Sequence, residues 1–170
     1  MLPNLLARKL ALVVCGAAVG RRSAKLGQYY AGPGNRFWRT LSDVGLTSRE
    51  LSPVEAQHLL TVGIGLTDLV KGRAGNDNEL RFTRADAVAL RAKIVLYQPR
   101  YLCFNGKRAA CEFFRISQVN YGVQRERIGR TVLFVAPSTS RAANASWDLA
   151  VWKDLAARVR RPKGRRLTSA

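Results

Sequence analysis

Short apolar runs alternate along the chain with longer segments in which apolar residues recur at helical spacing. The runs predict buried strands at residues 10–16, 63–70, 100–106 and 131–137. The longer segments predict helices at residues 35–46, 52–60, 83–97, 107–114 and 146–160. Because strands alternate with helices, we expect an α/β fold, a three-layer α/β/α sandwich with a central, mostly parallel sheet.

Local signals indicate where several of these helices begin. Residues 52–55, Ser-Pro-Val-Glu, form a complete helix-start signal. Thr83 is expected to cap the helix that follows it, and Ser146 is expected to cap the last helix. We expect one domain over residues 1–160 and a basic, flexible tail over residues 161–170, where apolar periodicity is lost.

The charge of the chain is its strongest compositional signal. Lysine and arginine number 29 against 11 aspartate and glutamate residues, which gives a net charge of +18, and 47% of the residues are apolar. A folded domain does not need this excess, but a polyanionic partner makes it useful through counterion release. Nucleic acid is the partner we expect. An anionic membrane surface is the weaker alternative, and a basic protein without such a partner is the third.

Cysteine and histidine usage argue against a disulfide framework and against a metal site. The three cysteines lie in or beside apolar runs, which indicates reduced thiols in a cytoplasmic protein. His58, the single histidine, is expected to be structural, so we expect neither a metal nor another cofactor. Arg8 and Lys9 interrupt the apolar N-terminus, and no run of about twenty apolar residues predicts a membrane span.

Four loops rich in small and basic residues follow the predicted strands, and parallel sheets bind their ligands at this edge. The loops are GAAVGRRSA, TDLVKGRAGNDNE, NGKRA and APSTSRAAN. Small residues let backbone N–H groups approach a ligand closely, and a helix start behind them favours a phosphate. The loops lack the sequences of a nucleotide-hydrolysing phosphate loop and of a dinucleotide fingerprint. Their convergence therefore predicts a nucleic-acid cleft.

These segments resemble, in the same order, the mismatch-specific uracil/thymine-DNA glycosylase family of the uracil-DNA glycosylase superfamily. The resemblance covers residues 10–157 and rests on AGPGNRFWRTLSDVGL, ELSPVEAQHLLTVGIGLTDLV, FNGKRAACEFF and VAPSTSRAAN. It implies a monofunctional enzyme of base excision repair that flips uracil out of DNA and hydrolyses its N-glycosidic bond, leaving an abasic site. A monomer is the default expectation. No metal, cofactor or protein nucleophile is implied.

The resemblance also implies a pocket for the flipped base. Tyr30 takes the position of the family's stacking aromatic, with packing in the core as the alternative. The first loop supplies backbone N–H groups that would receive the charge developing on the uracil carbonyl. Its residues are Gly16, Ala17, Ala18 and Gly20, with Ser23 behind them. Ala18 stands where the family has the asparagine that positions the attacking water, so the usual catalytic side chain is missing.

A substitute for that asparagine is expected in the loop after the second predicted strand. Asp77 is preferred over Asn78 because only a carboxylate both orients a water and offsets a cationic sugar. A surface turn is the alternative for these two residues. Asp68, which ends its strand in LTDLV, is a further candidate.

DNA contacts are expected from basic and polar residues of the same loops. Lys107 and Ser138 resemble phosphate contacts, and Arg141 would fill the space that the flipped base leaves. Because the family's usual wedge sequence and its asparagine are absent, we expect a weaker dependence on a U·G mismatch, and action on uracil opposite any base or in single-stranded DNA. The remaining candidates are Arg21, Arg22, Asn35 and Ser140. For each arginine a solvated surface charge is the alternative.

A glycosylase is the leading hypothesis. Because Ala18 cannot hydrogen-bond a water through its side chain, a protein that binds uracil or abasic sites in DNA with little or no catalysis is the alternative. An RNA-binding α/β module is a third, weaker hypothesis, since no strand carries an array of stacking aromatic residues.

Overall fold

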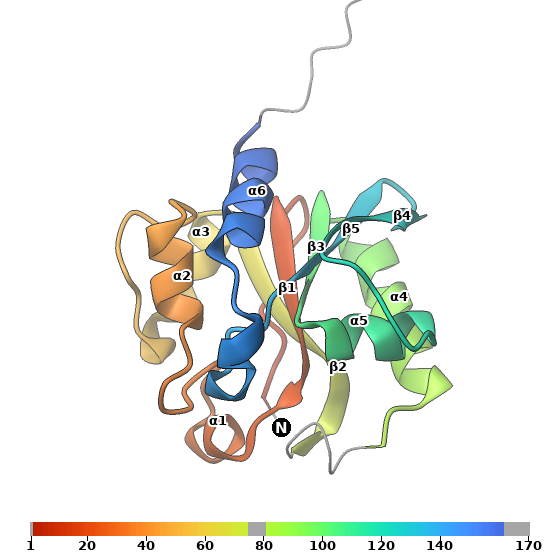
Figure 1. Ribbon diagram of the computed structural model, residues 1–170, viewed down its shortest axis with the longest axis horizontal. Helices are drawn as coiled ribbons and strands as arrows, with labels where there is room; N and C mark the ends of the chain where they lie inside the picture. Colours follow the sequence, from red (N-terminus) through yellow and green to blue (C-terminus); the bar gives the residue numbers. More distant parts are fainter. Residues whose placement is uncertain (1, 75–80, 162–170) are drawn as a thin grey trace, which may run out of the picture.

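The computed structural model describes residues 2–74 and 81–161. A five-stranded sheet with the order β2-β1-β3-β5-β4 lies at its centre (Figure 1). The strands are β1 (Leu12–Val19), β2 (Ile64–Ala74), β3 (Tyr101–Asn105), β4 (Gly122–Ile128) and β5 (Thr131–Ala136). All neighbouring pairs are parallel except β4 and β5, which are antiparallel. The predicted α/β class, with a mostly parallel central sheet between helices, is therefore confirmed.

Helices cover both faces of the sheet (Figure 1). One face carries α4 (Arg84–Tyr97) and α5 (Lys107–Phe114). The other carries α2 (Phe37–Asp43), α3 (His58–Thr61) and α6 (Leu149–Arg160). The short helix α1 (Arg21–Leu26) follows the end of β1, and two 3-10 turns, η1 (Pro53–Glu55) and η2 (Arg141–Ser146), complete the described elements.

The strand β1 is buried on both faces, which explains its uninterrupted apolar run. Leu12 and Val14 pack in the cluster beneath α2 and α6, whereas Val13 and Cys15 pack in the cluster beneath α4 and α5. All four side chains are completely buried. Full burial of one such valine or leucine stabilises a fold by about 1.5–3 kcal/mol, so β1 anchors both layers.

Two of the predicted helix starts have the expected hydrogen bonds. The Thr83 hydroxyl accepts from the Asp86 N–H at 3.3 Å, and the Asp86 carboxylate accepts from the Thr83 N–H at 2.7 Å. The Glu55 carboxylate likewise accepts from the Ser52 N–H at 2.9 Å. Residues 52–60, however, form η1 and then α3 rather than one continuous helix.

Other local predictions were wrong. Ser146 does not cap the last helix, because its hydroxyl donates to the Ala143 carbonyl within η2, and Asp148 accepts from the Ala150 N–H at 2.8 Å instead. The strand β2 continues to Ala74, into the segment expected as loop. Neither α1 nor β4 was predicted. β4 is an edge strand with mostly exposed side chains, so it lacks the apolar run that marks the buried strands.

Within the described ranges, no helix combines the length and the apolar character needed to cross a membrane. Arg161 is the only residue of the predicted tail that the structure describes. The division into one domain and a basic tail stays a prediction.

Candidate functional site

A cavity of about 680 Å³ lies at the carboxyl ends of β1 and β3 and beside β2. The predicted pocket residues on its wall are Gly16, Ala17, Ala18, Gly20, Ser23 and Tyr30. The predicted DNA contacts on its wall are Arg21, Arg22, Asn35, Ser138 and Ser140. The other lining residues are Val19, Tyr29, Gly32, Asp68, Asn105, Thr139 and Ala142. Segments far apart in the sequence thus meet at one edge of the sheet.

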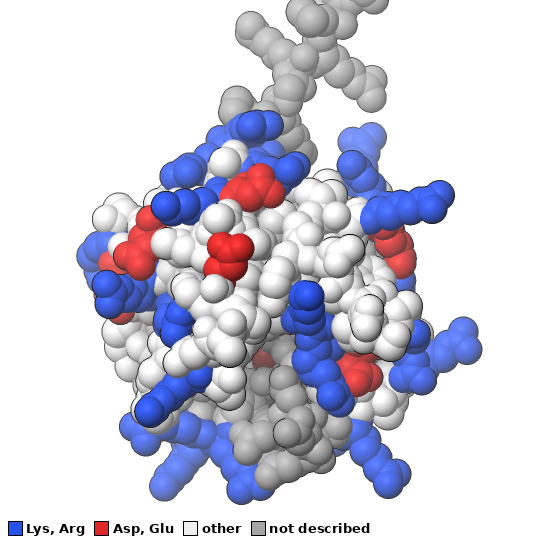
Figure 2. All heavy atoms as spheres, viewed as in Figure 1, with Lys and Arg blue, Asp and Glu red and all other residues white. Residues whose placement is uncertain are grey.

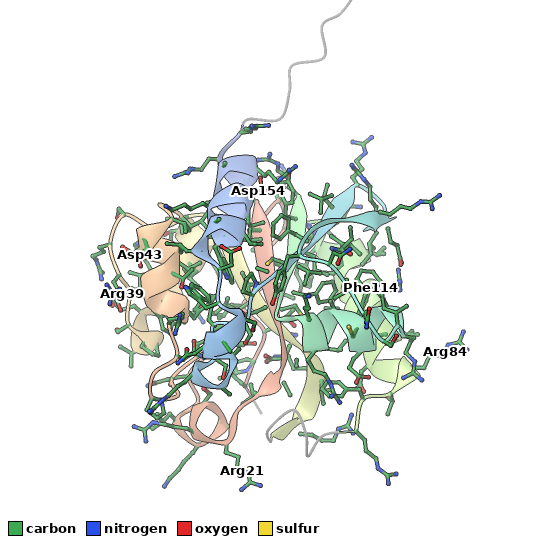
Figure 3. The ribbon with its side chains drawn as sticks, in the orientation of Figure 1. Arg21, Arg39, Asp43, Arg84, Phe114 and Asp154 are labelled. Carbon is green, nitrogen blue, oxygen red and sulfur yellow. The ribbon has the colours of Figure 1, made fainter. Side chains whose placement is uncertain are left out.

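Basic side chains gather at the end of the molecule where α1 lies. Figure 2 shows lysine and arginine side chains around this end and again near the end of α6. Arg21 extends from α1 away from the sheet (Figure 3), while Arg22 is also exposed. A polyanion approaching the cavity therefore meets positive charge.

The position of Gly16 brings polar groups of two segments close together inside the cavity. Gly16 pairs with Asp68 of the neighbouring strand β2. A Cβ atom on Gly16 would lie 2.8 Å from Asp68 Oδ1 and 3.4 Å from the Tyr30 hydroxyl oxygen. Only glycine leaves room for this approach, so Gly16 shapes the cavity through its missing side chain. β1 continues to Val19, so Gly16 and its neighbours, expected as a loop, lie in the strand.

Asp68 is the one carboxylate on the cavity wall among the described residues, and it is only 2% exposed. Its Oδ2 accepts a hydrogen bond from Lys71 Nζ at 3.1 Å. The same ammonium group donates to the Tyr29 hydroxyl at 2.8 Å. Asp68 is thus a buried acid with a cationic partner behind it, the arrangement that buried charges require.

Burial raises the pKa of Asp68, while the charges of Lys71 and Lys93 and hydrogen bonds from Lys71 and Tyr29 oppose that rise. Burial, followed by the nearby Asp68 charge, raises the pKa values of Tyr29 and Tyr30. Both tyrosines therefore remain neutral hydroxyl groups at physiological pH.

Tyr30 presents both a ring and a hydroxyl group to this site. Its ring stacks on Phe37 with the centroids 3.9 Å apart and the planes 27° apart. Its backbone has a φ of 52°, which is strained for a residue with a side chain. Its buried hydroxyl makes no hydrogen bond of normal geometry with the described residues, although Asn105 lies near enough to oppose the rise of its pKa. Such a group costs stability unless a ligand or water satisfies it.

The end of β3 is tied to the loop that follows β5. Asn105, which is 8% exposed, donates through Nδ2 to the Thr139 hydroxyl at 2.9 Å, and its Oδ1 accepts from the Thr139 N–H at 3.0 Å. This pair fixes one wall of the cavity. Asn105 was not predicted as a site residue, although it is the first residue of the NGKRA loop, before the glycine that ends a buried strand.

The loop of Gly32, Pro33 and Gly34 packs against η2 beside the cavity. A Cβ on Gly34, whose φ is +73°, would lie 2.9 Å from Cδ of Arg141, so the arginine stem lies across the glycine. The Arg36 guanidinium hydrogen-bonds Asn144 and stacks over Trp147, 4.6 Å from its ring centroid. Arg141 itself is exposed and not on the cavity wall.

Several predicted DNA contacts also stabilise local structure. Asn35 Oδ1 accepts from the Phe37 N–H at the start of α2, at 3.0 Å. Ser138 Oγ accepts from the Ser140 N–H, and Ser140 Oγ accepts from the Ala142 N–H. Lys107, at the start of α5, lies over the Tyr121 ring at 4.5 Å and is not on the cavity wall.

Asp77 and Asn78, the predicted catalytic residues, lie outside the described residues. In the described part of the chain, no three His, Cys, Asp or Glu side chains come together in a way that could hold a metal ion. Asp68, the further candidate named from the sequence, is the acid that the structure brings into the cavity.

Comparisons with known proteins agree with this architecture. Residues 3–156 match the family described as the uracil DNA glycosylase superfamily. The fold is similar to the solution NMR structure of a candidate uracil DNA glycosylase from Methanosarcina acetivorans, with a TM-score of 0.57 and 20% sequence identity. That match covers 93% of this chain and 94% of the other. At this identity the likeness concerns the fold alone.

Proposed function

Because the chain belongs to the uracil DNA glycosylase superfamily, we propose that it is a uracil-DNA glycosylase of the mismatch-specific type, acting in base excision repair. It flips uracil out of DNA and hydrolyses the N-glycosidic bond to leave an abasic site. The observation that carries this proposal is the buried Asp68 carboxylate beside the Tyr30 hydroxyl, in a cavity at the carboxyl ends of β1 and β3.

The polar groups of the cavity match the edge of uracil. Uracil presents an N3–H donor between two carbonyl acceptors. Asp68 Oδ1, which faces Gly16, supplies an acceptor for the N–H, and the Tyr30 hydroxyl supplies a donor for a carbonyl. A base whose carbonyl accepts from the Tyr30 hydroxyl lies at the edge of the ring and not on its face, so stacking on the Tyr30 ring is the alternative role of this residue.

The reaction needs no protein nucleophile, because water is the group that adds to the sugar. The C1′–N1 bond breaks with its electron pair passing to the base, water adds to C1′, and a proton is released to solvent. Backbone N–H groups of residues 17–20 stabilise the negative charge on the departing uracil. This electrostatic contribution compensates for Ala18, which has no group to activate the water.

The net charge of +18 supplies the affinity for DNA. Arg21 and Arg22 contact the phosphates at the cavity mouth, and Arg141 fills the vacated position in the stack. We propose a monomeric cytoplasmic protein whose basic tail adds phosphate affinity without sequence readout. A damage-binding protein with little catalysis is the second candidate, because Ala18 removes the usual water-positioning group.

The test is single-turnover excision from end-labelled U·G duplex, U·A duplex and single-stranded oligonucleotides, read as alkali-sensitive breaks. The wild type is expected to cut at uracil in all three. Asp68→Ala should slow excision about a hundredfold, by analogy with the loss of one preorganised polar contact. Asp154→Asn, which removes an exposed acid of α6 outside the cavity, is the matched control and should not change the rate.

Two further outcomes separate the candidates. Asp77→Asn tests the predicted water-positioning carboxylate and should slow excision if that residue acts on the water. Wild-type protein that binds uracil-containing DNA in preference to a thymine control, yet leaves every uracil uncut, would favour the damage-binding protein.

A further inference from the structure

We propose that Lys71 is a positioning residue: it orients Asp68 from outside the cavity and supplies the positive charge that lets an ionised Asp68 lie beside a departing anionic base. This inference rests on the proposed function, and it concerns a residue that touches neither the base nor the sugar.

The contacts of Lys71 show that it acts through Asp68. Its ammonium group donates to Asp68 Oδ2 at 3.1 Å, to the Tyr29 hydroxyl at 2.8 Å and to the Leu2 carbonyl at 3.2 Å. An ammonium group has three N–H donors, so all of them are used. Lys71 is absent from the cavity wall, while Asp68 is on it. The lysine therefore holds one carboxylate oxygen and leaves Oδ1 facing Gly16.

A local irregularity of β2 makes this contact possible. Residues three apart in a regular strand point to opposite faces, so Lys71 would normally point away from Asp68. Here Ala18 pairs with Val70 and Val19 pairs with Ala74, so one step along β1 matches four along β2. The intervening residues bulge, with Gly72 at a φ of +82°. The bulge brings the Lys71 side chain to the face that carries Asp68.

Charge balance explains why the lysine is needed. An ionised Asp68 is the stronger acceptor for the uracil N3–H, but its negative charge, unless a cation balances it, would oppose the negative charge that bond cleavage places on the base in a buried site. Lys71 is the cation that pairs with Asp68 directly. Lys93 of α4 is the other cation acting on Asp68, but it donates to the Thr67 hydroxyl. The remaining titratable neighbours, Cys15 of β1 and the two tyrosines, are neutral because burial raises each pKa.

A double-mutant cycle tests the proposal, because a counter-charge matters only while Asp68 is an acid. Single-turnover excision is measured for Lys71→Met, Asp68→Asn and the double variant across pH 5–9. Lys71→Met should slow excision about tenfold or more at pH 7, and the acid limb of its profile should move about one pH unit higher. In the Asp68→Asn background the same change should alter the rate less than about threefold.

Matched variants separate this role from folding and from net charge. Lys71→Arg should restore most of the rate, and Arg158→Met, which removes an exposed cation paired with Asp154, should leave the profile unchanged. Equal losses from Lys71→Met in the acid and amide backgrounds, with an unmoved acid limb, would overturn the proposal. Circular dichroism confirms that each variant is folded.

A second measurement does not depend on turnover. The ¹³C shift of the Asp68 carboxyl group, followed by NMR against pH, should show a higher titration midpoint in Lys71→Met than in the wild type. If the wild type excises no uracil, the glycosylase proposal fails, while this titration still reports on Lys71. An unchanged midpoint would overturn the inference about Lys71 even in an active enzyme.

Discussion

Thr67 and Asp68 are neighbours in β2, but their side chains lie on opposite faces of the strand and in different surroundings. Each side chain accepts a hydrogen bond from a lysine: Lys93 reaches the Thr67 hydroxyl at 3.2 Å and Lys71 reaches the Asp68 carboxylate at 3.1 Å. Both side chains are buried. Only the face of Asp68 opens into the cavity.

The neighbouring strand explains the difference. Thr67 lies beside Cys15, whose buried thiol fills the space between β1 and the helices α4 and α5. Asp68 lies beside Gly16, which has no side chain to fill the equivalent space. The pairing of β1 with β2 therefore has a packed core on one face and a polar cavity on the other. The cavity lies on the face where Gly16 has no Cβ atom.

Filling that space should have the largest effect. Gly16→Ala places a methyl group 2.8 Å from Asp68 Oδ1, so the carboxylate must move. A displacement of about 1 Å in a reacting site can cost about a hundredfold in rate, which we expect in single-turnover excision. Asp154→Asn, which changes an exposed residue of α6 outside the cavity, is the control. Equal rates for the two variants would mean that Gly16 does not set the geometry of the site.

Removing the Tyr30 hydroxyl should have a smaller effect on the same face. Tyr30→Phe keeps the ring stacked on Phe37 and deletes an oxygen that has no described partner. We expect a slightly higher melting temperature, because an unsatisfied buried group is lost, and excision slowed about threefold to tenfold. A variant that loses stability and keeps its full rate would show that the hydroxyl serves the core alone.

The two lysines should differ in their effect on the pH profile. Lys93→Met removes a cation that influences Asp68 without contacting it, so the acid limb of excision should move by less than in Lys71→Met. The rate at pH 7 should stay within about twofold of wild type. Shifts of equal size in the two variants would indicate that net charge, and not the Lys71 contact, controls Asp68.

The smallest expected effect concerns stability. Because burial raises the pKa of folded Asp68, its contribution to stability is complete below the ordinary aspartate pKa and is lost as the pH rises through the raised value. Asp68→Asn lacks this titration. Its melting temperature should therefore gain on the wild type as the pH rises from below the ordinary aspartate pKa, which thermal scans across that range would measure. Thr67→Val should show no such pH dependence.

Much of the fold follows from local patterns. The apolar runs of β1, β3 and β5 predicted buried strands because side chains on both faces must leave water. The signal at Thr83 identified the start of α4, since it depends on residues three apart. β4 escaped prediction because an edge strand with exposed side chains has no such run. Ser146 was misassigned because a serine bonds equally well within a 3-10 turn.

The candidate site was predictable only in outline. The glycines and small residues near the ends of the predicted strands predicted the correct edge of the sheet for the cavity, and its wall includes Gly16 and Ser23. Asp68 ranked below Asp77 because the family resemblance placed a pocket-facing acidic residue in the loop that contains Asp77. Nothing local to the sequence indicated that the strand beside it would carry a glycine at that register.

The sequence by itself determined the alternation of strands and helices, the basic charge and the motifs that resemble the glycosylases, because these depend on residue type and short spacing. Only the tertiary structure placed Gly16 beside Asp68 and brought the Tyr30 hydroxyl close to Gly16. It also turned Lys71 toward Asp68 and the Tyr29 hydroxyl, through the bulge in β2. Those relations depend on strand register, and register is decided when distant segments pack together.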